Sequence, residues 1–598
     1  MDRAQRPLID RIDLDRFALL LWVAVVLVCL AVFWTAIAVL DLRDNDDYLR
    51  IVQVRDLLAG QSWFDVTQYR INPEGGGGLM HWSRFIDMQI AGLILLLRLF
   101  LAPEAAERWA LAIYPLLLIL PLFLLLARVL AMLGDKRQAI GGMLVAATGV
   151  TFLHYFVPLR VDHHNWQLLL SVAMLWLALR PPSFGRGLVA ALVIAAHVEI
   201  SLEGLPYLAI FGALFALDWL RDLRAASRLA GFAAGLAVIP PIWSLIFRGW
   251  QSFVTLHCDA FAPSYAGGAA ATGLVLFACM QVRGLTATWQ RRLVALVLAG
   301  IAGAGVFAIL GRPCLGGPFG ELEPLVRHFW YERVMEGRPV WAQDPAIAAL
   351  FFTPTVVGFG AAIWAWRRAR GSEFADNWNR LLFVLLCSVP LSMIVFRTGA
   401  TTHAYLVPAF GTMAAALWDW SRARESALAR IGATMLVLTA IPAFDAQLAE
   451  RAMLAALPDE MVALRKPSAA DESCPTQPML AALAREPATL IFAPLDLGPS
   501  ILVRTRHSVI ATGHHRNHRA MNQVITAFLS DPAQAKPIVE ASHADILLLC
   551  TQLPESENLA RVKPQGLAGR LIRGETVDWL AYDAKLSQGQ LRVYRIRR

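Results

Sequence analysis

Residues 17–40 read FALLLWVAVVLVCLAVFWTAIAVL, an apolar run that contains no charged side chain. A helix of this length is long enough to cross the roughly 30 Å hydrocarbon core of a bilayer. The run is not followed by a small-residue cleavage site, which favours a retained helix over a signal peptide. The stretch therefore predicts that the chain enters a membrane.

Similar apolar segments recur up to residue 445. Of the 598 residues, 57% are hydrophobic and only 17% are charged, whereas soluble proteins carry about 25% charged residues. We expect a polytopic α-helical membrane protein over residues 1–445 and a soluble α/β domain over residues 446–598. Fourteen segments can be counted, near 17–40, 88–103, 109–132, 138–157, 165–180, 187–199, 205–220, 228–247, 270–283, 291–310, 346–367, 380–396, 402–419 and 428–445.

The distribution of arginine orients these segments. The second segment is short and interrupted by Arg98, so we expect it to lie along the interface as an amphipathic helix. About thirteen transmembrane helices then remain, and the arginine-rich loops all fall on one side, which the positive-inside rule makes the cytoplasm. The opposite side receives residues 41–108, 158–165, 248–269, 311–345, the RTGATT turn and residues 446–598. We therefore expect a bacterial inner-membrane protein whose C-terminal domain is periplasmic.

Polar residues gather in the turn RVDHH, residues 160–164. Asp162 and His164 are one residue apart and can point the same way in an extended turn. A carboxylate and an imidazole suit Mn²⁺, Mg²⁺ or Zn²⁺, and phosphate oxygens would favour a hard cation. His163 would stabilise the turn or contact substrate. The alternative is an interfacial turn whose polar groups face water.

A second acidic cluster, RDNDDY, occupies residues 43–48. Three aspartates in four positions repel one another unless a cation or arginines neutralise them. A solvated acidic cap is the alternative. One divalent cation, Mn²⁺ or Mg²⁺, shared by this cluster and the RVDHH turn would explain both.

The order of these motifs resembles the catalytic subunit of oligosaccharyltransferase and its single-subunit bacterial and archaeal counterparts, which have the GT-C fold. NDDY matches the aspartate that follows the first helix in that family, and VDHH matches its archaeal DHH motif. The resemblance implies that Asp46, Asp162 and His164 hold the metal. It also implies a catalytic Glu336, in RVMEGRP, beside Asp46, and an extracytoplasmic soluble domain.

The segment PLDLG resembles the family motif W-W-D-x-G, and Asp496 and Gly498 match its last positions. Pro494 and Leu495 stand where the family has tryptophans that read the acceptor peptide. We therefore expect an acceptor other than an Asn-x-Ser/Thr peptide. Asp496 is expected to face the acceptor. In the nearby GHHRN segment, we expect the same of His515, Arg516 and Asn517. The alternative for this segment is a solvated basic loop.

Basic side chains are also expected near the phosphate of a lipid-linked donor. Arg397 and His403 lie in RTGATTHAY at the predicted outer membrane face, and arginine suits bidentate phosphate contacts. We also expect His81, Arg84 and His163 near this phosphate. Anchoring at the interface is the alternative for the RTGATTHAY residues.

These features predict a glycosyltransferase that moves a sugar or oligosaccharide from a polyprenyl-(pyro)phosphate to an acceptor protein, glycan or lipid. One alternative is a GT-C enzyme that transfers a single sugar from polyprenyl phosphate to a glycan or lipid. A transporter or flippase is disfavoured, because coupled transporters usually place ionisable residues at the membrane midplane and the predicted spans hold almost none. Nucleic acid is not an expected partner, because the basic residues behind the net charge of +8 are dispersed over loops.

Within residues 446–598, ATLIFAPL, SVIAT and ADILLLC are typical of strands, and AMNQVITAFL is typical of a helix. Cys474 and Cys550 are the only cysteines of this domain. In an oxidising compartment we expect them to form a disulfide.

Reporter fusions test the predicted topology. A reporter fused after residue 135 should lie in the cytoplasm, and a reporter fused after residue 160 should lie outside it. The reason is that arginine-rich loops are retained on the cytoplasmic side. The reverse pattern would contradict the topology and the predicted side of the site.

Overall fold

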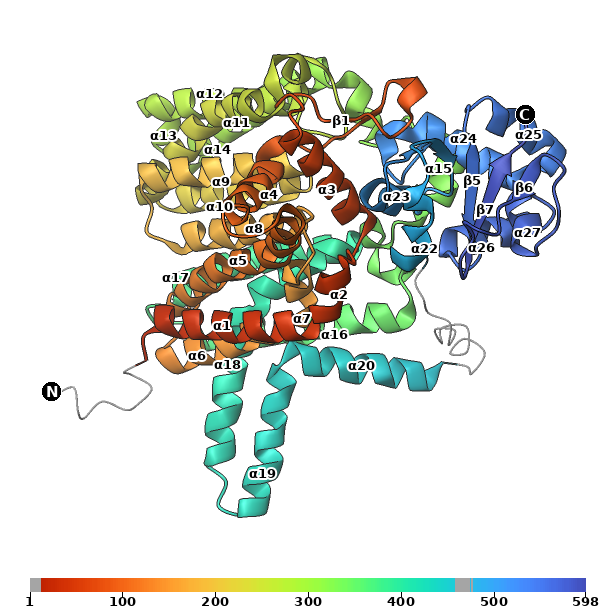
Figure 1. Ribbon diagram of the computed structural model, residues 1–598. Coiled ribbons are helices and arrows are strands. Elements are labelled where there is room, and N and C mark those ends of the chain that lie inside the picture. The colour runs from red at the N-terminus through yellow and green to blue at the C-terminus, as the bar shows by residue number, and fades with distance from the viewer. Residues whose placement is uncertain (1–11, 458–473, 475–476) are drawn as a thin grey trace.

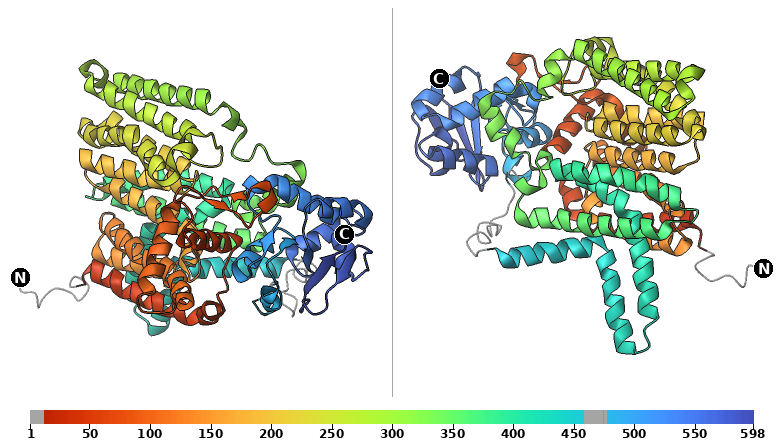
Figure 2. Two further views of the ribbon diagram at one scale, coloured as in Figure 1. Left: turned by 45° about the horizontal axis from the view of Figure 1, so that its top comes forward. Right: turned by 180° about the vertical axis from the view of Figure 1, so that it is seen from behind.

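The computed structural model describes residues 12–457, 474 and 477–598. Figure 1 shows a bundle of long helices with an α/β domain at one end, and Figure 2 shows the same two parts from other directions. Helix α1 (Leu14–Val32) begins at the end of the bundle that lies opposite to the C-terminal domain. The two-part architecture expected from the sequence is confirmed.

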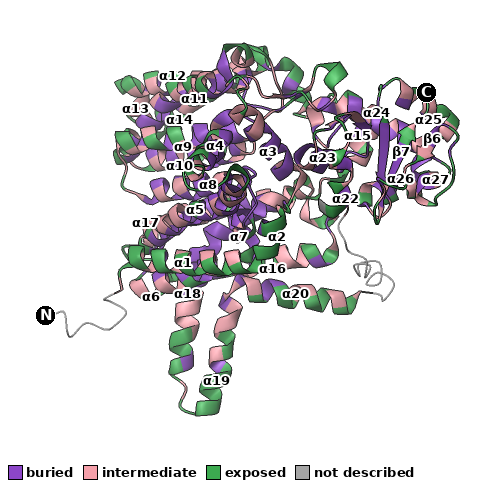
Figure 3. Cartoon of the chain, viewed as in Figure 1, coloured by how far each residue is buried: buried purple, intermediate pink, exposed green. Residues whose placement is uncertain are grey.

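The bundle has the dimensions of a membrane domain. Among the described residues, eight helices are long and apolar enough to cross a bilayer, or ten if each of two bent pairs counts as one span. Much of helix α1 is exposed or of intermediate burial (Figure 3). Its exposed residues include the apolar Leu20 and Leu27, which suits contact with lipid. The chain is thus a multi-pass membrane protein, and the total of about thirteen spans stays a prediction. Its long helices include α5 (Pro103–Ala131), α6 (Lys136–Ala147), α8 (His164–Leu179), α9 (Phe184–Ile200), α10 (Gly204–Arg221), α11 (Ala226–Val254), α12 (Pro263–Gln281), α14 (Trp289–Leu310), α16 (Pro345–Ala369), α17 (Ala375–Ile394) and α18 (Gly399–Arg422).

The last expected segment, 428–445, is not one straight helix. It is divided between α19 (Ala427–Met435), which continues as a 3₁₀ turn to Ala440, and α20 (Pro442–Ala456), and the two parts meet at 90°. Pro442 begins α20; its ring would clash with the preceding turn if the first helix continued. Helix α20 packs on α16, so the bundle extends past the expected boundary at 445. The described part of the C-terminal domain begins with α22 (Gln477–Ala481).

The segment 41–108, called the first outside segment after its predicted side, follows the short helix α2 (Trp34–Val39). It contains α3 (Asn45–Leu58), the short strands β1 (Thr67–Gln68) and β2 (Gly78–Leu79), and α4 (Arg84–Leu97). Helix α4 corresponds to the apolar segment that was expected at the interface. It has 14 residues, which is too few to span a bilayer. Ile86, Ile90 and Ile94 are buried against the protein, whereas Leu95 and Leu96 are about half exposed.

A buried ionic cluster joins α3 to α4. The Asp87 carboxylate on α4 accepts hydrogen bonds from Arg50 (3.0 Å), Arg84 (3.2 Å) and Gln53 (2.7 Å). Arg84 is fully buried and also donates to the carbonyl oxygen of Gln53 and to the side chain of Gln61. In this structure Arg84 is committed to the interior of the first outside segment, and its expected contact with a donor phosphate stays a prediction.

The C-terminal domain is built on a five-stranded sheet in the order β4-β3-β5-β7-β6. Strand β3 is parallel to β4 and β5, whereas β7 is antiparallel to both β5 and β6. The three expected strands and the expected helix are confirmed as β3, β4, β5 and α24, and Cys474 is disulfide-bonded to Cys550, as expected. The bounds are β3 (Leu490–Phe492), β4 (Ser508–Val509), β5 (Ile546–Cys550), β6 (Leu580–Tyr582), β7 (Leu591–Ile596), α23 (Gly498–Arg504), α24 (His518–Leu529), α25 (Pro532–Glu540), α26 (Pro554–Val562) and α27 (Leu567–Ile572).

The C-terminal domain rests on the first outside segment. Helix α23 packs against α3, and the Arg55 guanidinium of α3 donates to the carbonyl oxygen of Val503 (2.7 Å). The backbone N–H of Asn72 donates to the carbonyl oxygen of Val509 at 2.7 Å. The residues after Asp44 are thereby held between the bundle and the C-terminal domain.

Replacing Asp87 with alanine should destabilise the protein strongly. The change leaves the guanidiniums of Arg50 and Arg84 buried without a counter-charge, which costs about 3–5 kcal/mol. The measurement is the unfolding temperature of the purified full-length chain in detergent. Asp419→Ala is the control. Asp419 also forms an ion pair, with Arg137, but both side chains of that pair are more than half exposed. Equal unfolding temperatures for the two variants would contradict the role of the buried cluster.

Candidate active site

The turn at residues 160–164 lies between the short 3₁₀ helix His154–Phe156 and the start of α8. It begins after Leu159, whose φ of 70° is uncommon for a residue with a Cβ atom. The backbone N–H of Leu159 donates to the carbonyl oxygen of Leu111 on α5 (3.2 Å). The bundle thus fixes the direction in which the turn leaves it.

The carboxylate of Asp47, on α3, organises this turn. One of its oxygens accepts the backbone N–H groups of Val161 (2.8 Å) and Asp162 (2.9 Å), and the other accepts the Arg160 guanidinium (3.0 Å). Asp47 is fully buried; burial raises its pKa to about 7, although Arg160 acts in the opposite direction. The sequence drew attention to the RDNDDY cluster but gave Asp47 no separate role.

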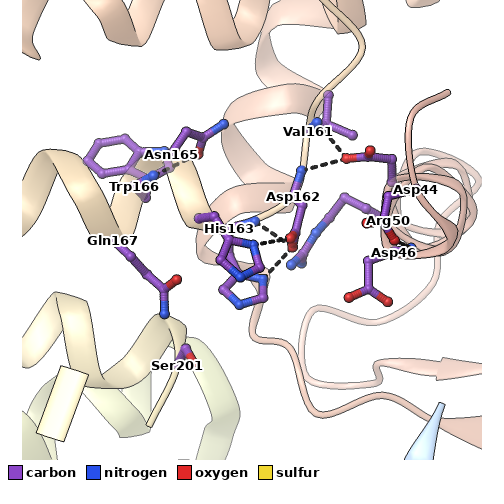
Figure 4. Close-up of polar contacts among 12 residues, drawn as sticks. Asp44, Asp46, Arg50, Val161, Asp162, His163, Asn165, Trp166, Gln167 and Ser201 are labelled. Atoms are coloured by element: carbon purple, nitrogen blue, oxygen red, sulfur yellow. Dashed lines mark hydrogen bonds and ion pairs between the residues drawn. The ribbon is translucent and has the colours of Figure 1, made fainter. Parts of the chain in front are cut away.

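Asp162 is the centre of the cluster. Its two carboxylate oxygens contact the Nδ1 atoms of His163 and His164, and the three side chains are buried (Figure 4). One ligand atom from each lies within 4.8 Å of the others. Burial alone would raise the pKa of Asp162, yet the two imidazoles hold it well below its usual value. Asp162 is therefore a carboxylate that two histidines flank.

Asp46 lies beside this cluster, in the first turn of α3 (Figure 4). Burial, and next the negative charges of Asp162 and Asp44, raise the pKa of Asp46 well above its ordinary value. A divalent cation between these carboxylates would remove that repulsion. The Nε2 atom of His164 is buried and has no hydrogen-bond partner among the described residues. The residues present therefore fit a divalent cation; that Asp46, Asp162 and His164 are the ligands stays a prediction.

Glu336 reaches the same cluster from the segment 311–345. It lies in the 3₁₀ turn Met335–Gly337, and its carboxylate oxygens are 3.9 Å from Nη2 of Arg160 and 3.9 Å from Nε2 of His164. Its side chain is 39% exposed. The structure thus places Glu336, Asp46 and Asp162 together from three separate outside segments. Arg160, which also pairs with Asp44 at 2.9 Å, was not among the predicted site residues.

Arg397 lies on the bundle side of the cluster. Its guanidinium is ion-paired with Glu203. Both residues line a small cavity together with His164, with about 20 Å³ of free space, enough for about one water molecule. The other lining residues are Tyr155, Gln167, Leu168, His197, Tyr207, Thr398 and Thr401.

His403 is not part of this group. Its Nε2 atom is 2.9 Å from the Thr355 hydroxyl and 3.1 Å from the carbonyl oxygen of Phe351, both on α16. The ring is 2% exposed. Its position on α18 turns His403 toward the neighbouring helix α16, and the expected contact with a donor phosphate stays a prediction.

The residues expected on the acceptor side are divided. Asp496 accepts a hydrogen bond from the Asn45 amide (2.8 Å), next to Asp46. His515 and Arg516 both bind Asp259 and lie with His81 in a separate group. Asn517 is buried and donates to the carbonyl oxygen of Ile510 (3.3 Å). 

His81 contacts His514 of the C-terminal domain at 2.8 Å and not the cluster around Asp162. Asn517 also accepts a hydrogen bond from the Asn72 amide (3.4 Å), so it joins the two parts of the protein. The expected roles of His81 at the donor phosphate and of Asn517 on the acceptor side stay predictions.

No protein-family profile and no curated protein matches this chain. Solved structures do match. The archaeal oligosaccharyltransferase AglB from Archaeoglobus fulgidus, in complex with an inhibitory peptide and a dolichol-phosphate, is similar over 95% of this chain and 72% of its own, with 14% identity and a TM-score of 0.61. The A. fulgidus enzyme in complex with Zn and sulfate is similar over 96% and 73%, with 14% identity and a TM-score of 0.57.

A third structure of the A. fulgidus enzyme is tethered to an acceptor peptide containing the NVT sequon; it is similar over 97% of this chain and 74% of its own, with 13% identity and a TM-score of 0.50. At these identities the likeness shows a common fold. The chain therefore has the GT-C fold of these oligosaccharyltransferases over nearly its whole length, as its motif order suggested.

The geometry predicts how Asp47 affects metal binding. Asp47→Asn should weaken Mn²⁺ binding by about 10–100-fold, because the turn that carries Asp162 loses its anchor. Asp162→Asn should weaken it more. Calorimetric titration of the purified protein gives both values, with the exposed Asp222→Asn as control. Unchanged affinity in both site variants would contradict a metal site here.

Proposed function

We propose that this GT-C membrane protein is a glycosyltransferase that moves a sugar or oligosaccharide from a polyprenyl-(pyro)phosphate donor to an acceptor on the extracytoplasmic side. The observation that carries the proposal is the meeting of Asp46, Asp162 and Glu336, from three outside segments, at one end of a bundle of membrane-crossing helices. Such a site faces a lipid-linked substrate while its chemistry stays outside the hydrocarbon.

Asp46, Asp162 and His164 would hold a divalent cation, Mn²⁺ or Mg²⁺. When bound, the cation supplies charge neutralisation for the leaving phosphate. His163 fills the remaining side of Asp162, and Asp47 with Arg160 keeps the turn in place. These contacts would pre-organise the site, so that no rearrangement of the chain is needed when the substrate binds.

The donor phosphate would lie between the cluster and Arg397. The guanidinium borders the same small cavity as His164, and it could exchange its pair with Glu203 for a bidentate phosphate contact. AglB is similar in fold and has been solved with a dolichol-phosphate, which agrees with a lipid phosphate as the donor class.

The acceptor would enter at the exposed edge of the cluster, where Glu336 lies. Glu336 or Asp46 would orient the attacking group or take its proton. Asp496 would line the same entrance through its hydrogen bond to Asn45. The acceptor would be a protein, a glycan or a lipid, and the compartment the periplasm of a bacterium.

A GT-C enzyme that transfers one sugar to a glycan or lipid is the second candidate. Leu495, which stands at a tryptophan position of the sequon-binding motif, is 2% exposed, and its backbone N–H donates to the Glu555 carboxylate (3.0 Å). A side chain buried in this way cannot face a bound peptide. This favours an acceptor that differs from the sequon peptide tethered to the A. fulgidus enzyme.

Glu336→Gln should lower sugar transfer by about 10²–10⁴-fold, because the amide cannot accept the acceptor's proton. The assay follows transfer from a labelled polyprenyl-linked sugar by the purified protein in detergent. Glu332→Gln is the matched control, since Glu332 is exposed in the same segment and pairs only with His328 among the described residues. Equal activity of both variants would exclude Glu336 from catalysis, and transport without transfer in vesicles would contradict the proposed reaction.

An Asn-x-Ser/Thr peptide should not be glycosylated by this protein at the rate of its own acceptor. The buried Leu495 leaves no aromatic surface at that position for the peptide. Incubation with the peptide and labelled donor, analysed by mass spectrometry, tests this. Efficient transfer that is lost in Asp496→Ala would show that the acceptor is a sequon.

A further inference from the structure

A second group of histidines lies where the first outside segment meets the C-terminal domain. His81 follows β2, and His514 and His515 lie between β4 and α24. Nδ1 of His81 is 2.8 Å from Nε2 of His514, and the ring centroids of His81 and His515 are 4.9 Å apart. Each histidine offers a ring nitrogen within 4.8 Å of the other two. None of the three contacts the cluster around Asp162 in the described structure.

The burial and pairing of these rings suit a metal ion. His514 is 3% exposed, and its Nδ1 atom has no hydrogen-bond partner among the described residues. Nδ1 of His81 and Nε2 of His514 share a single hydrogen bond. A buried ring nitrogen without a partner is uncommon in proteins, and a metal ion would supply the missing contact.

A carboxylate lies behind the group, as in many zinc sites. Nε2 of His515 is 2.6 Å from an Asp259 oxygen, which leaves Nδ1 of the ring for a metal ion. Such a carboxylate–histidine contact fixes the ring and raises its basicity. Cys258, the neighbour of Asp259, is disulfide-bonded to Cys314. The segment that supplies the carboxylate is thus fixed covalently.

The surrounding charges do not exclude a cation. Arg516 donates to both oxygens of Asp259 (2.6 and 3.0 Å). Arg248, which donates to the carbonyl oxygen of His81 (2.9 Å), is ion-paired with Glu199. Each guanidinium is compensated by a carboxylate, so the two arginines add no uncompensated positive charge beside the three rings.

We propose that His81, His514 and His515 bind a transition-metal ion of the Zn²⁺ class that ties the first outside segment to the C-terminal domain. Three imidazoles without a carboxylate ligand select zinc and its neighbours over Mg²⁺ and Mn²⁺, and water would take the fourth position. The ligands come from segments far apart in sequence, so only the folded chain presents the complete set and binding stabilises it.

Cobalt provides the test. The full-length protein in detergent is stripped with a chelator and titrated with Co²⁺, whose four-coordinate complexes absorb strongly in the visible range. The wild type should develop this absorption at about one equivalent, as one tri-histidine site requires, and Zn²⁺ should remove it. Zn²⁺ should also raise the unfolding temperature.

Four variants test which residues bind the Co²⁺ that gives this absorption. It should be lost in His81→Ala and in His514→Ala. It should persist in His518→Ala, a matched control from the same segment whose ring binds Glu323 (2.7 Å). It should also persist in Asp162→Asn, which separates this site from the cluster of the proposed function.

Three results would overturn the proposal. They are a wild type without the absorption, an absorption that survives in both His81→Ala and His514→Ala, and an absorption that disappears in Asp162→Asn. The first result does not depend on whether any variant folds. It would leave the three rings as a packed group of histidines.

Discussion

The site depends on one buried carboxylate, that of Asp47. It accepts two backbone N–H groups and one guanidinium from the turn at residues 160–164, and hydrogen bonds to a charged group are among the stronger ones in proteins. The contact joins α3 to the turn that precedes α8. Asp46 and Asp162, whose segments are more than a hundred residues apart, meet because their neighbours are bound in this way. Without Asp47, the buried N–H groups of Val161 and Asp162 would lose the carboxylate oxygen that accepts them.

The first outside segment is the common support of the protein. On one side its α3 and α4 are locked by the cluster around Asp87, and on another side α3 carries α23 of the C-terminal domain. Its β2 strand leads to His81, which meets the C-terminal histidines. A segment that contacts both parts can fix the entrance to the site. It also explains why so many of its polar residues are buried and few are free to bind a ligand.

Part of the site could be predicted from the sequence. Asp46, Asp162, His164 and Glu336 were assigned through motif order, and the structure brings all four together. Arg84 and His403 were assigned through residue type and predicted depth, and both are buried in structural contacts. A basic residue near a membrane face can bind a phosphate, or it can form an ion pair with a carboxylate inside the protein. The choice depends on whether a carboxylate such as Asp87 lies opposite, which no local pattern reveals.

The sequence by itself determined the membrane class, the short helix α4 that cannot span a bilayer, and three of the five strands of the C-terminal sheet. Apolar run length, alternation and loop charge act locally, so they can be read along the chain. Only the tertiary structure decided that Asp47 anchors the turn and that His81, His514 and His515 meet. These features depend on contacts between segments more than a hundred residues apart. Their energy comes from pairing buried polar groups, and the partner of each group is set by the packing of the whole chain.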